Sequence, residues 1–109
     1  MVRLNIVLTP GTSRGVDDLL EALRFVISGT RLEPGCVGCS AWADPDLSVH
    51  YVETWASELD LRHHVRSSLF TSLLAILESL RAPPHLQFDF VSTSRGLDYV
   101  AEVRGEPSD

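Results

Sequence analysis

Hydrophobic and polar positions follow a strand-like pattern at the start of the chain and then change to a helical spacing. Residues 2–9 are mostly apolar or β-branched, and Pro10-Gly11 ends the run, which predicts a strand. The apolar residues that follow recur every three or four positions, as they do on one face of an amphipathic helix. They are Val16, Leu19, Leu20, Leu23, Val26 and Ile27. Gly29 and Pro34-Gly35 predict the end of this helix.

The middle of the chain predicts a β-hairpin and then a second helical region. Residues 36–43 and 48–56 have strand-like composition, and the turn Asp44-Pro45-Asp46 separates them. Ser57 is a suitable N-cap for the following helix, because its hydroxyl oxygen can accept a bond from a backbone N–H of the first turn. Polar residues interrupt the apolar stripe of this helix near Ser67-Ser68. The stripe comprises Leu61, Val65, Leu69, Leu73, Ile76, Leu77 and Leu80.

Two more strands are predicted in the last part of the chain. Residues 85–92 follow Pro83-Pro84 and place Leu86, Phe88 and Phe90 on one face. Residues 97–103, after the turn Arg95-Gly96, predict a further C-terminal strand, and residues 105–109 predict a flexible tail. The resulting order predicts an α+β, ferredoxin-like βαββαβ domain over residues 1–104, with an extra C-terminal strand and both helical regions on one face of an antiparallel sheet.

The other face of this sheet also needs a cover. Along residues 48–56, Tyr51 and Trp55 lie on one face, while Val52 and Thr54 lie on the other, so neither face is purely polar. A second subunit would cover the face that the helices leave free. We therefore expect a homodimer.

Composition narrows the classes of function. The 109 residues carry 15 Asp and Glu against 9 basic residues, a net charge of −6, and every basic residue is Arg. This balance argues against a surface for nucleic acid or for anionic membranes. The absence of Lys excludes Schiff-base chemistry. No apolar run approaches the roughly 20 residues that cross a bilayer, and the start of the chain lacks a secretory signal, so we expect a cytoplasmic protein.

Cys36 and Cys39 form the pattern Cys-x-x-Cys. A structural zinc ion needs four ligands, and one such pair supplies two, so no metal site is predicted. In a regular strand a separation of three directs the two thiols to opposite faces. We expect small, half-buried thiols, with a reversible disulfide as the alternative.

Several polar side chains lie among apolar residues. His64 lies at the edge of the helical stripe, four residues after Asp60, a carboxylate that can hold its imidazole. Glu53 stands between Tyr51 and Trp55 on one strand face, where the aromatic rings are either core or the wall of a pocket for a flat ligand. Asn5 interrupts an apolar strand and needs a partner or a ligand if it is buried. No phosphate loop or nucleophile elbow is present, so we expect no tightly held cofactor.

A known family shares several of these residues. The segments Glu33-Pro34-Gly35-Cys36 and Glu53-Thr54-Trp55-Ala56-Ser57, then His64 nine residues after the tryptophan, and Phe70 resemble the antibiotic biosynthesis monooxygenase (ABM) family, over residues 2–103. The resemblance implies a dimeric α+β barrel with a pocket between the sheet and the helices of each subunit. It also implies that an ionised quinol or polycyclic phenol reduces dioxygen directly, without a cofactor.

The resemblance also implies roles for individual residues. Trp55 matches the family's pocket tryptophan, and His64 matches the histidine of the quinol-oxidising branch, which makes it the expected proton-transfer group. Asn5 matches a pocket asparagine of the haem-degrading branch and would polarise the substrate or the peroxide. Tyr51 and Leu61 stand where the polyketide-acting branch has Asn and Tyr.

The substrate site predicted by the resemblance is therefore made of Trp55, Tyr51, Glu53 and Leu61, with Asn5 and His64 as the catalytic residues. Leu73 replaces an iron-ligating histidine, so haem degradation is not expected. We expect Trp55 and His64 to converge on an enclosed pocket sized for a planar ring. The alternative is a dimeric module that binds a small aromatic ligand without turnover.

Overall fold

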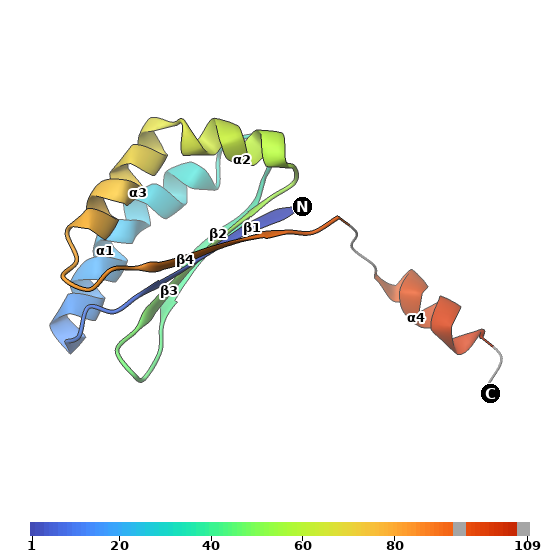
Figure 1. Ribbon diagram of the computed structural model, residues 1–109, viewed down its shortest axis with the longest axis horizontal. Helices are drawn as coiled ribbons and strands as arrows, with labels where there is room; N and C mark the ends of the chain where they lie inside the picture. Colours follow the sequence, from blue (N-terminus) through green and yellow to red (C-terminus); the bar gives the residue numbers. More distant parts are fainter. Residues whose placement is uncertain (93–95, 107–109) are drawn as a thin grey trace.

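The predicted ferredoxin-like arrangement is confirmed in a computed structural model, which describes residues 1–92 and 96–106 (Figure 1). The elements are β1 (Val2–Leu8), α1 (Ser13–Thr30), β2 (Cys36–Ala43), β3 (Val49–Trp55), α2 (Glu58–Val65), α3 (Ser68–Glu78), β4 (His85–Phe90) and α4 (Leu97–Arg104). The four strands form one antiparallel sheet in the order β2-β3-β1-β4.

Helices α1, α2 and α3 lie along one face of the sheet, and the opposite face carries no helix in the described part of the chain (Figure 1). Strand register assigns side chains to these faces. Leu4 pairs with Glu53 and Ile6 with Tyr51, so these side chains point towards the helices. Asn5 pairs with Val52 and therefore belongs to the open face.

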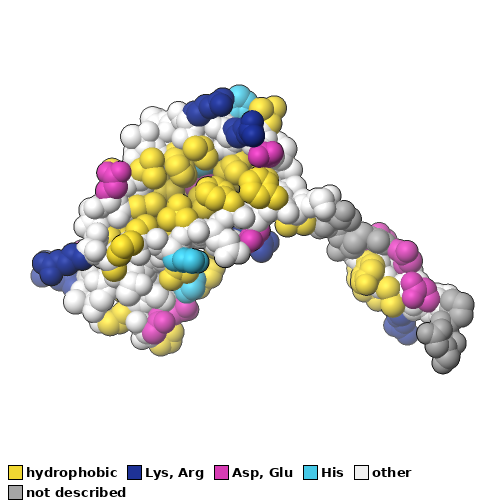
Figure 2. Space-filling model, viewed as in Figure 1, with side chains coloured by type: hydrophobic (Ala, Val, Ile, Leu, Met, Phe, Trp, Pro, Cys, Tyr) yellow, Lys and Arg dark blue, Asp and Glu magenta, His cyan; other side chains and the backbone are white. Residues whose placement is uncertain are grey.

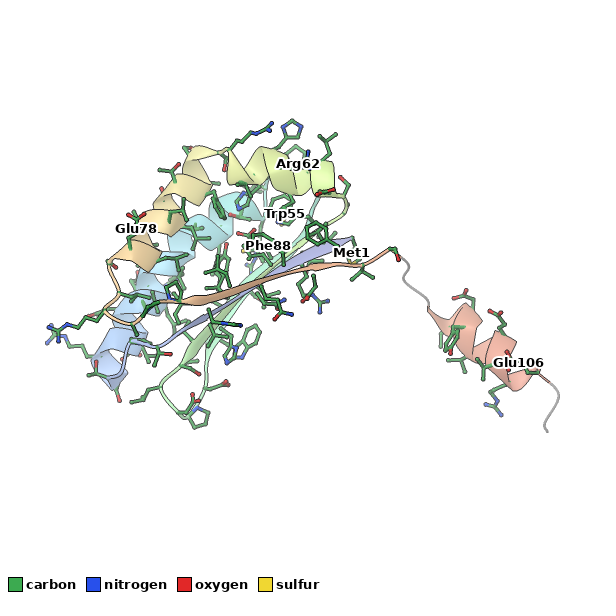
Figure 3. All side chains as sticks on the ribbon, viewed as in Figure 1. Met1, Trp55, Arg62, Glu78, Phe88 and Glu106 are labelled. Carbon is green, nitrogen blue, oxygen red and sulfur yellow. The ribbon has the colours of Figure 1, made fainter. Side chains whose placement is uncertain are left out.

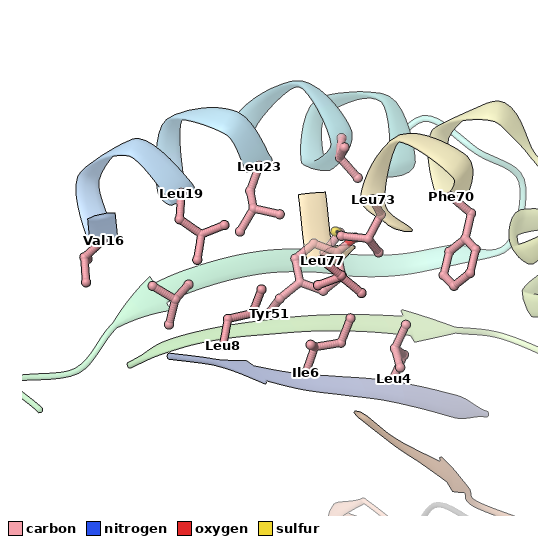
Figure 4. Packing of buried hydrophobic residues seen from close by; sticks show 13 residues of the cluster. Leu4, Ile6, Leu8, Val16, Leu19, Leu23, Tyr51, Phe70, Leu73 and Leu77 are labelled. Atoms are coloured by element: carbon pink, nitrogen blue, oxygen red, sulfur yellow. The ribbon is translucent and has the colours of Figure 1, made fainter. Parts of the chain in front are cut away.

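The core lies between the sheet and helices α1 and α3. On β1 every second side chain is buried, which confirms the alternation read from the sequence. Figure 4 shows leucines of α1 and α3 packed on side chains of β1 and β3. The buried cluster contains Leu4, Ile6, Leu8, Val16, Leu19, Leu23, Val26, Cys39, Val49, Tyr51, Phe70, Leu73 and Leu77.

The interruption predicted near Ser67-Ser68 is a real break between α2 and α3. Ser57 caps α2, because its Oγ accepts a bond from the backbone N–H of Asp60 at 3.2 Å. Ser67 caps α3 in the same way through Phe70 N–H, at 3.3 Å, and its hydroxyl donates to the carbonyl of His64 at 2.6 Å. The break lets α2 follow the end of the sheet where β3 finishes.

The C-terminal strand expected over residues 97–103 is wrong, because this segment is helix α4. Tyr99 and Val100 favour a strand by composition, but Leu97, Ala101 and Arg104 have the spacing of one helix face. Strand β4 is an edge strand and pairs with β1. The turn expected at Arg95-Gly96 and the expected tail over 105–109 lie partly outside the described residues.

Candidate functional site

A buried polar cluster connects α2 to the sheet. It consists of Tyr51, Glu53 and Trp55 on β3, His64 on α2, and Glu33 in the segment between α1 and β2. The four residues from β3 and α2 are at most 1% exposed, and Glu33 is partly buried. Three of them are residues predicted to bind substrate, and the structure brings them together with His64.

Both ring nitrogens of His64 are bonded to carboxylates. Nδ1 lies 2.6 Å from Oε2 of Glu33, and Nε2 lies 2.9 Å from Oε2 of Glu53. Glu53 also accepts bonds from two aromatic side chains, at 2.5 Å from the hydroxyl of Tyr51 and at 3.0 Å from Nε1 of Trp55. Every polar atom of this buried histidine and its central carboxylate therefore has a partner.

The electrostatics of the cluster favour a charged imidazole. Burial lowers the pKa of His64, but the bonds and charges of Glu53 and Glu33 outweigh it, so the pKa is raised above its ordinary value. Burial raises the pKa of Tyr51, and the charge of Glu53 adds to the effect. The hydroxyl of Tyr51 therefore stays protonated and donates to Glu53.

Trp55 and His64 converge as expected, but they do not enclose a pocket. Their ring centroids are 4.6 Å apart with the planes tilted by 30°, and Phe70 meets the imidazole edge-on at 5.5 Å. A spacing of this size is direct ring contact, which leaves no room for a planar ligand. The expected enclosed pocket between Trp55 and His64 is therefore filled by the protein's own side chains.

An open groove lies next to this cluster, between α2 and β4. It has a volume of about 340 Å³ and is lined by Glu58, Leu61, Arg62, Val65, Arg66, Phe88 and Phe90. Leu61 joins the groove to the buried cluster, since it also packs with Trp55 and Val2. Figure 3 shows Trp55 and Phe88 below the helix that carries Arg62. Hydrophobic side chains form a continuous surface between the helices and β4 (Figure 2).

Of the predicted substrate residues, only Leu61 lines this groove. The predicted site did not include Arg62, Arg66, Phe88 or Phe90, which line the groove. A signal was present for the two phenylalanines, because both lie on the same face of a strand at the sheet edge. No pattern in the sequence pointed to the arginines, which read as ordinary exposed positions of a helix.

Asn5 does not join His64. It lies on the open face of the sheet, where its Nδ2 donates to Oδ2 of Asp89 at 2.9 Å. The partner that its polar side chain requires is therefore a neighbouring strand residue. Asn5 and His64 therefore lie on opposite sides of the sheet in this chain.

The two cysteines point to the same face of the sheet, against the expectation from strand parity. A β-bulge between Cys36 and Gly38 shifts the register, so that Cys36 pairs with Trp55 and Cys39 with Glu53. Both thiols are free, and Sγ of Cys39 lies 3.3 Å from the hydroxyl of Tyr51. Burial raises the pKa of Cys39 to about 12.

Two further findings apply to the described residues. No group of three or more His, Cys, Asp or Glu side chains within residues 1–92 and 96–106 has an arrangement that could hold a metal ion. No helix in the same ranges combines the length and the hydrophobicity needed to cross a membrane.

The sequence matches no protein-family model, and it matches no curated protein. Solved structures do match the fold. One is named as an antibiotic biosynthesis monooxygenase and has a TM-score of 0.70 and 19% identity, covering 85% of this chain and 100% of its own. A provisionally named antibiotic biosynthesis monooxygenase from Deinococcus radiodurans has a TM-score of 0.74 and 17% identity, with coverages of 88% and 97%.

A third match is Rv0793 from Mycobacterium tuberculosis, with a TM-score of 0.68 and 19% identity over 87% of this chain and 98% of its own. At these identities the similarity concerns architecture, and it extends over most of each chain. The protein therefore has the α+β ferredoxin-like fold found in antibiotic biosynthesis monooxygenases.

Proposed function

We propose that this protein is a cofactor-independent monooxygenase of flat phenols or quinols and that the α2–β4 groove holds the substrate. The composition of the groove is the observation that carries the proposal. Leu61, Phe88 and Phe90 offer apolar and aromatic surface, and the lining also contains two arginines, Arg62 and Arg66, against one carboxylate, Glu58. An ionised phenol is a flat apolar ring with one negative charge, and it fits both features. Solved structures of this fold that are named monooxygenases support the type of reaction.

The groove would act on the substrate electrostatically. Positive charge beside a bound phenol lowers the pKa of its hydroxyl and favours the phenolate. In the proposed reaction the electron-rich anion transfers one electron to dioxygen, and the ring radical and superoxide combine to form a carbon–oxygen bond. The peroxide takes up a proton, and its O–O bond then breaks as the same carbon loses its remaining hydrogen. The carbon that reacts is the one that forms a CH₂ group in the keto tautomer of the phenol, so this CH₂ group and one dioxygen become one carbonyl group and one water molecule.

His64 has a positioning role in this proposal and does not transfer the proton. With both nitrogens bonded to carboxylates, the ring has no nitrogen left for a substrate. Its bond to Glu53 instead fixes α2 on the sheet. Leu61 and Arg62 are on the same helix, so this bond also fixes their distance from Phe88 on β4.

The second candidate is a module that binds a small aromatic molecule without oxidising it. The bonding of His64 favours this candidate, because both of its ring nitrogens already meet carboxylates and neither is left to accept a substrate proton. The apolar groove would serve binding equally well. The two candidates differ in oxygen consumption and share the groove.

Oxygen uptake with anthrone tests the proposal, since anthrone ionises to a phenolate and carries the required CH₂ group. We expect the native protein to consume one dioxygen per anthrone, and the double variant Arg62→Gln, Arg66→Gln to be slower by about tenfold. Arg24→Gln is the matched control, because Arg24 is exposed on α1 and pairs with Glu21 at 3.2 Å, away from the groove. Binding of anthrone without uptake would select the second candidate. Absence of binding would overturn both.

The open face of the sheet supports a homodimer as part of this proposal. Trp42 is 45% exposed there and stacks on His50 at 5.3 Å, and Val52 lies partly exposed on the same face. An exposed tryptophan on a face without helices is typical of an interface. Light scattering should give the mass of two chains for the native protein and of one chain for Trp42→Glu. A native monomer would contradict the proposed dimer.

A further inference from the structure

The two carboxylates that hold His64 differ in their access to water. Glu53 has no exposed side-chain surface, whereas the side chain of Glu33 is 22% exposed. Glu53 also accepts bonds from Tyr51 and Trp55, at 2.5 and 3.0 Å. Within residues 1–92 and 96–106, the carboxylate of Glu33 has one hydrogen-bond partner, His64. Glu33 can therefore leave the imidazole at a smaller cost than Glu53, because water can replace its one bond.

A small pocket lies beside Glu33, on the side of α2 opposite the α2–β4 groove. The backbone at Glu33 is fixed there, since its N–H donates to the carbonyl of Thr30 at 3.1 Å and its carbonyl accepts from Cys36 at 3.2 Å. The pocket thus gives the carboxylate room to move while the backbone stays in place. It has a volume of about 150 Å³ and is lined by Glu33, Pro34, Asp60, His63 and His64, a different set from the lining of the groove.

Loss of the imidazole proton changes the two contacts unequally. A charged imidazole donates from both nitrogens, whereas a neutral one donates from one nitrogen and has a lone pair on the other. A lone pair towards Glu53 would leave a buried carboxylate without a donor, which is costly. The remaining N–H therefore stays on Nε2, towards Glu53. The lone pair of Nδ1 then faces Oε2 of Glu33 at 2.6 Å, and the two repel one another.

Among the described residues near His64, no other titratable group removes this repulsion. Burial raises the pKa of Tyr51 on β3 and of Cys36 on β2, so both groups are neutral. Helix α3 contributes the uncharged ring of Phe70. On α2 itself, the groups that border the pocket lie where water screens their charge, and they are Asp60 and His63.

We propose that Glu33 is a latch operated by pH. When His64 loses its proton, the side chain of Glu33 turns into the pocket and leaves Nδ1 of His64 open to solvent as a proton acceptor. The bond between Nε2 and Glu53 remains, so α2 keeps its place on the sheet. Nδ1 opens on the side of α2 opposite the groove, where a phenol bound in the groove does not meet it. The latch goes beyond the proposed function, because it needs no substrate.

The titration of His64 is measured first. Nitrogen-15 chemical shifts of the imidazole show at which pH the ring becomes neutral and which nitrogen keeps the proton. We expect a neutral ring with its proton on Nε2. A neutral ring with its proton on Nδ1 overturns the proposal, because Glu53 would then be the carboxylate that is released. A ring that stays charged at every pH at which the protein is folded also overturns it.

Glutamine at position 33 then separates the latch from the titration. In Glu33→Gln the amide N–H can donate to the lone pair of Nδ1, so the neutral imidazole keeps its partner and stays covered. In Glu33→Ala nothing at position 33 covers the ring. Diethyl pyrocarbonate, which acylates the bare nitrogen of a neutral imidazole, reports the exposure of Nδ1. Trypsin releases residues 63–66 as one peptide, and fragmentation between His63 and His64 assigns the label.

All variants are compared at one pH above the transition of the native protein. We expect native His64 to be labelled about tenfold faster than His64 of Glu33→Gln, a ratio that corresponds to one hydrogen bond. Exposed His85 is the internal reference, and Glu21→Gln, on the exposed side of α1, is the matched control that should behave as the native protein.

Equal or faster labelling in a folded Glu33→Gln variant overturns the proposal. If this variant does not fold, Glu33→Ala decides. Native labelling at the rate of Glu33→Ala supports the latch, whereas native labelling slower by about tenfold means that Glu33 stays on the neutral ring and the proposal is wrong. No phenol enters these measurements, so failure of the proposed function leaves the result unaffected.

Discussion

Nε2 of His64 lies 2.9 Å from Oε2 of Glu53, and neither side chain has any exposed surface. The contact joins α2 to β3 inside the protein, where solvent cannot screen or replace it. Glu53 also accepts bonds from Tyr51 and Trp55. Loss of one member leaves the others unpaired, and this destabilises the fold because a buried charge is costly without partners.

We expect Glu53→Gln to lower the free energy of unfolding by about 3 kcal/mol. The amide removes the charge that faces the imidazole and supplies only one acceptor for Tyr51 and Trp55. Urea unfolding followed by tryptophan fluorescence measures the change. Glu58→Gln is the control, since Glu58 meets Arg62 at 3.5 Å on the surface and should contribute less than about 0.5 kcal/mol. Equal losses in the two variants would contradict a structural role for the buried pair.

Stability should also depend on pH through His64. Its pKa in the folded protein is raised above the value of about 6.5 expected in the unfolded chain. The folded state therefore holds a proton that the unfolded state releases at lower pH. The resulting stabilisation is fully present below about pH 6.5 and is lost as the pH rises through the pKa of the folded protein. The loss is at most about 1.4 kcal/mol for each pH unit.

Urea unfolding at intervals between about pH 6.5 and about pH 7.5 tests this dependence, because the cysteines of the unfolded chain, with a pKa of about 8.5, are still mostly protonated in that range. His64→Gln should show a flatter profile, since glutamine does not titrate. A native protein whose stability rises with pH over this interval would show that the imidazole is neutral in the fold.

Much of the fold follows from local patterns in the sequence. The alternation of apolar and polar residues predicts strand β1, and apolar residues every three or four positions predict helix α1. Ser57 and Ser67 mark where helices α2 and α3 begin. The resemblance to the ABM family also led us to expect that Trp55 and His64 meet, and their rings are in contact.

Other features depend on distant residues and could not be predicted in this way. Whether Trp55 and His64 enclose a pocket depends on Glu33, which is 31 positions from His64 and fixes the ring from the other side. The side of the sheet to which Cys36 and Cys39 point depends on a β-bulge, which changes the strand register without changing the composition of the strand. Helix α4 lies beyond an edge strand, where none of the four described strands imposes the extended form that Tyr99 and Val100 favour.

The two cysteines should differ in reactivity. Burial raises the pKa of both thiols, that of Cys39 to about 12, and thiolate is the reactive form. Cys36 is only partly buried, so we expect a thiol reagent at pH 8 to modify it first and to leave Cys39 unmodified in the native protein. Mass spectrometry of peroxide-treated protein should show no loss of two protons. Formation of a Cys36–Cys39 disulfide under these conditions would favour a redox role, and Cys36→Ser is the control for single modification.

Alanine substitutions at Gly35 and Gly11 would separate two contributions to the free energy of unfolding, one from backbone conformation and one from close packing. Both have a positive φ, 82° and 85°, which disfavours any residue with a Cβ atom. At Gly11 an added Cβ would have no neighbour within 4 Å, so Gly11→Ala should cost about 1 kcal/mol from the backbone alone.

At Gly35 the same atom would overlap the side chain of Asp60, including its Cβ at 2.5 Å. Asp60 cannot move freely, because the hydroxyl of Ser57 donates to its carboxylate at 2.8 Å within the cap of α2. We therefore expect Gly35→Ala to cost about 3 kcal/mol, the sum of the backbone term and a disrupted cap with a displaced helix. Urea unfolding of both variants gives the difference directly. Equal costs would mean that α2 shifts without resistance, and the groove that depends on its position would then be adjustable.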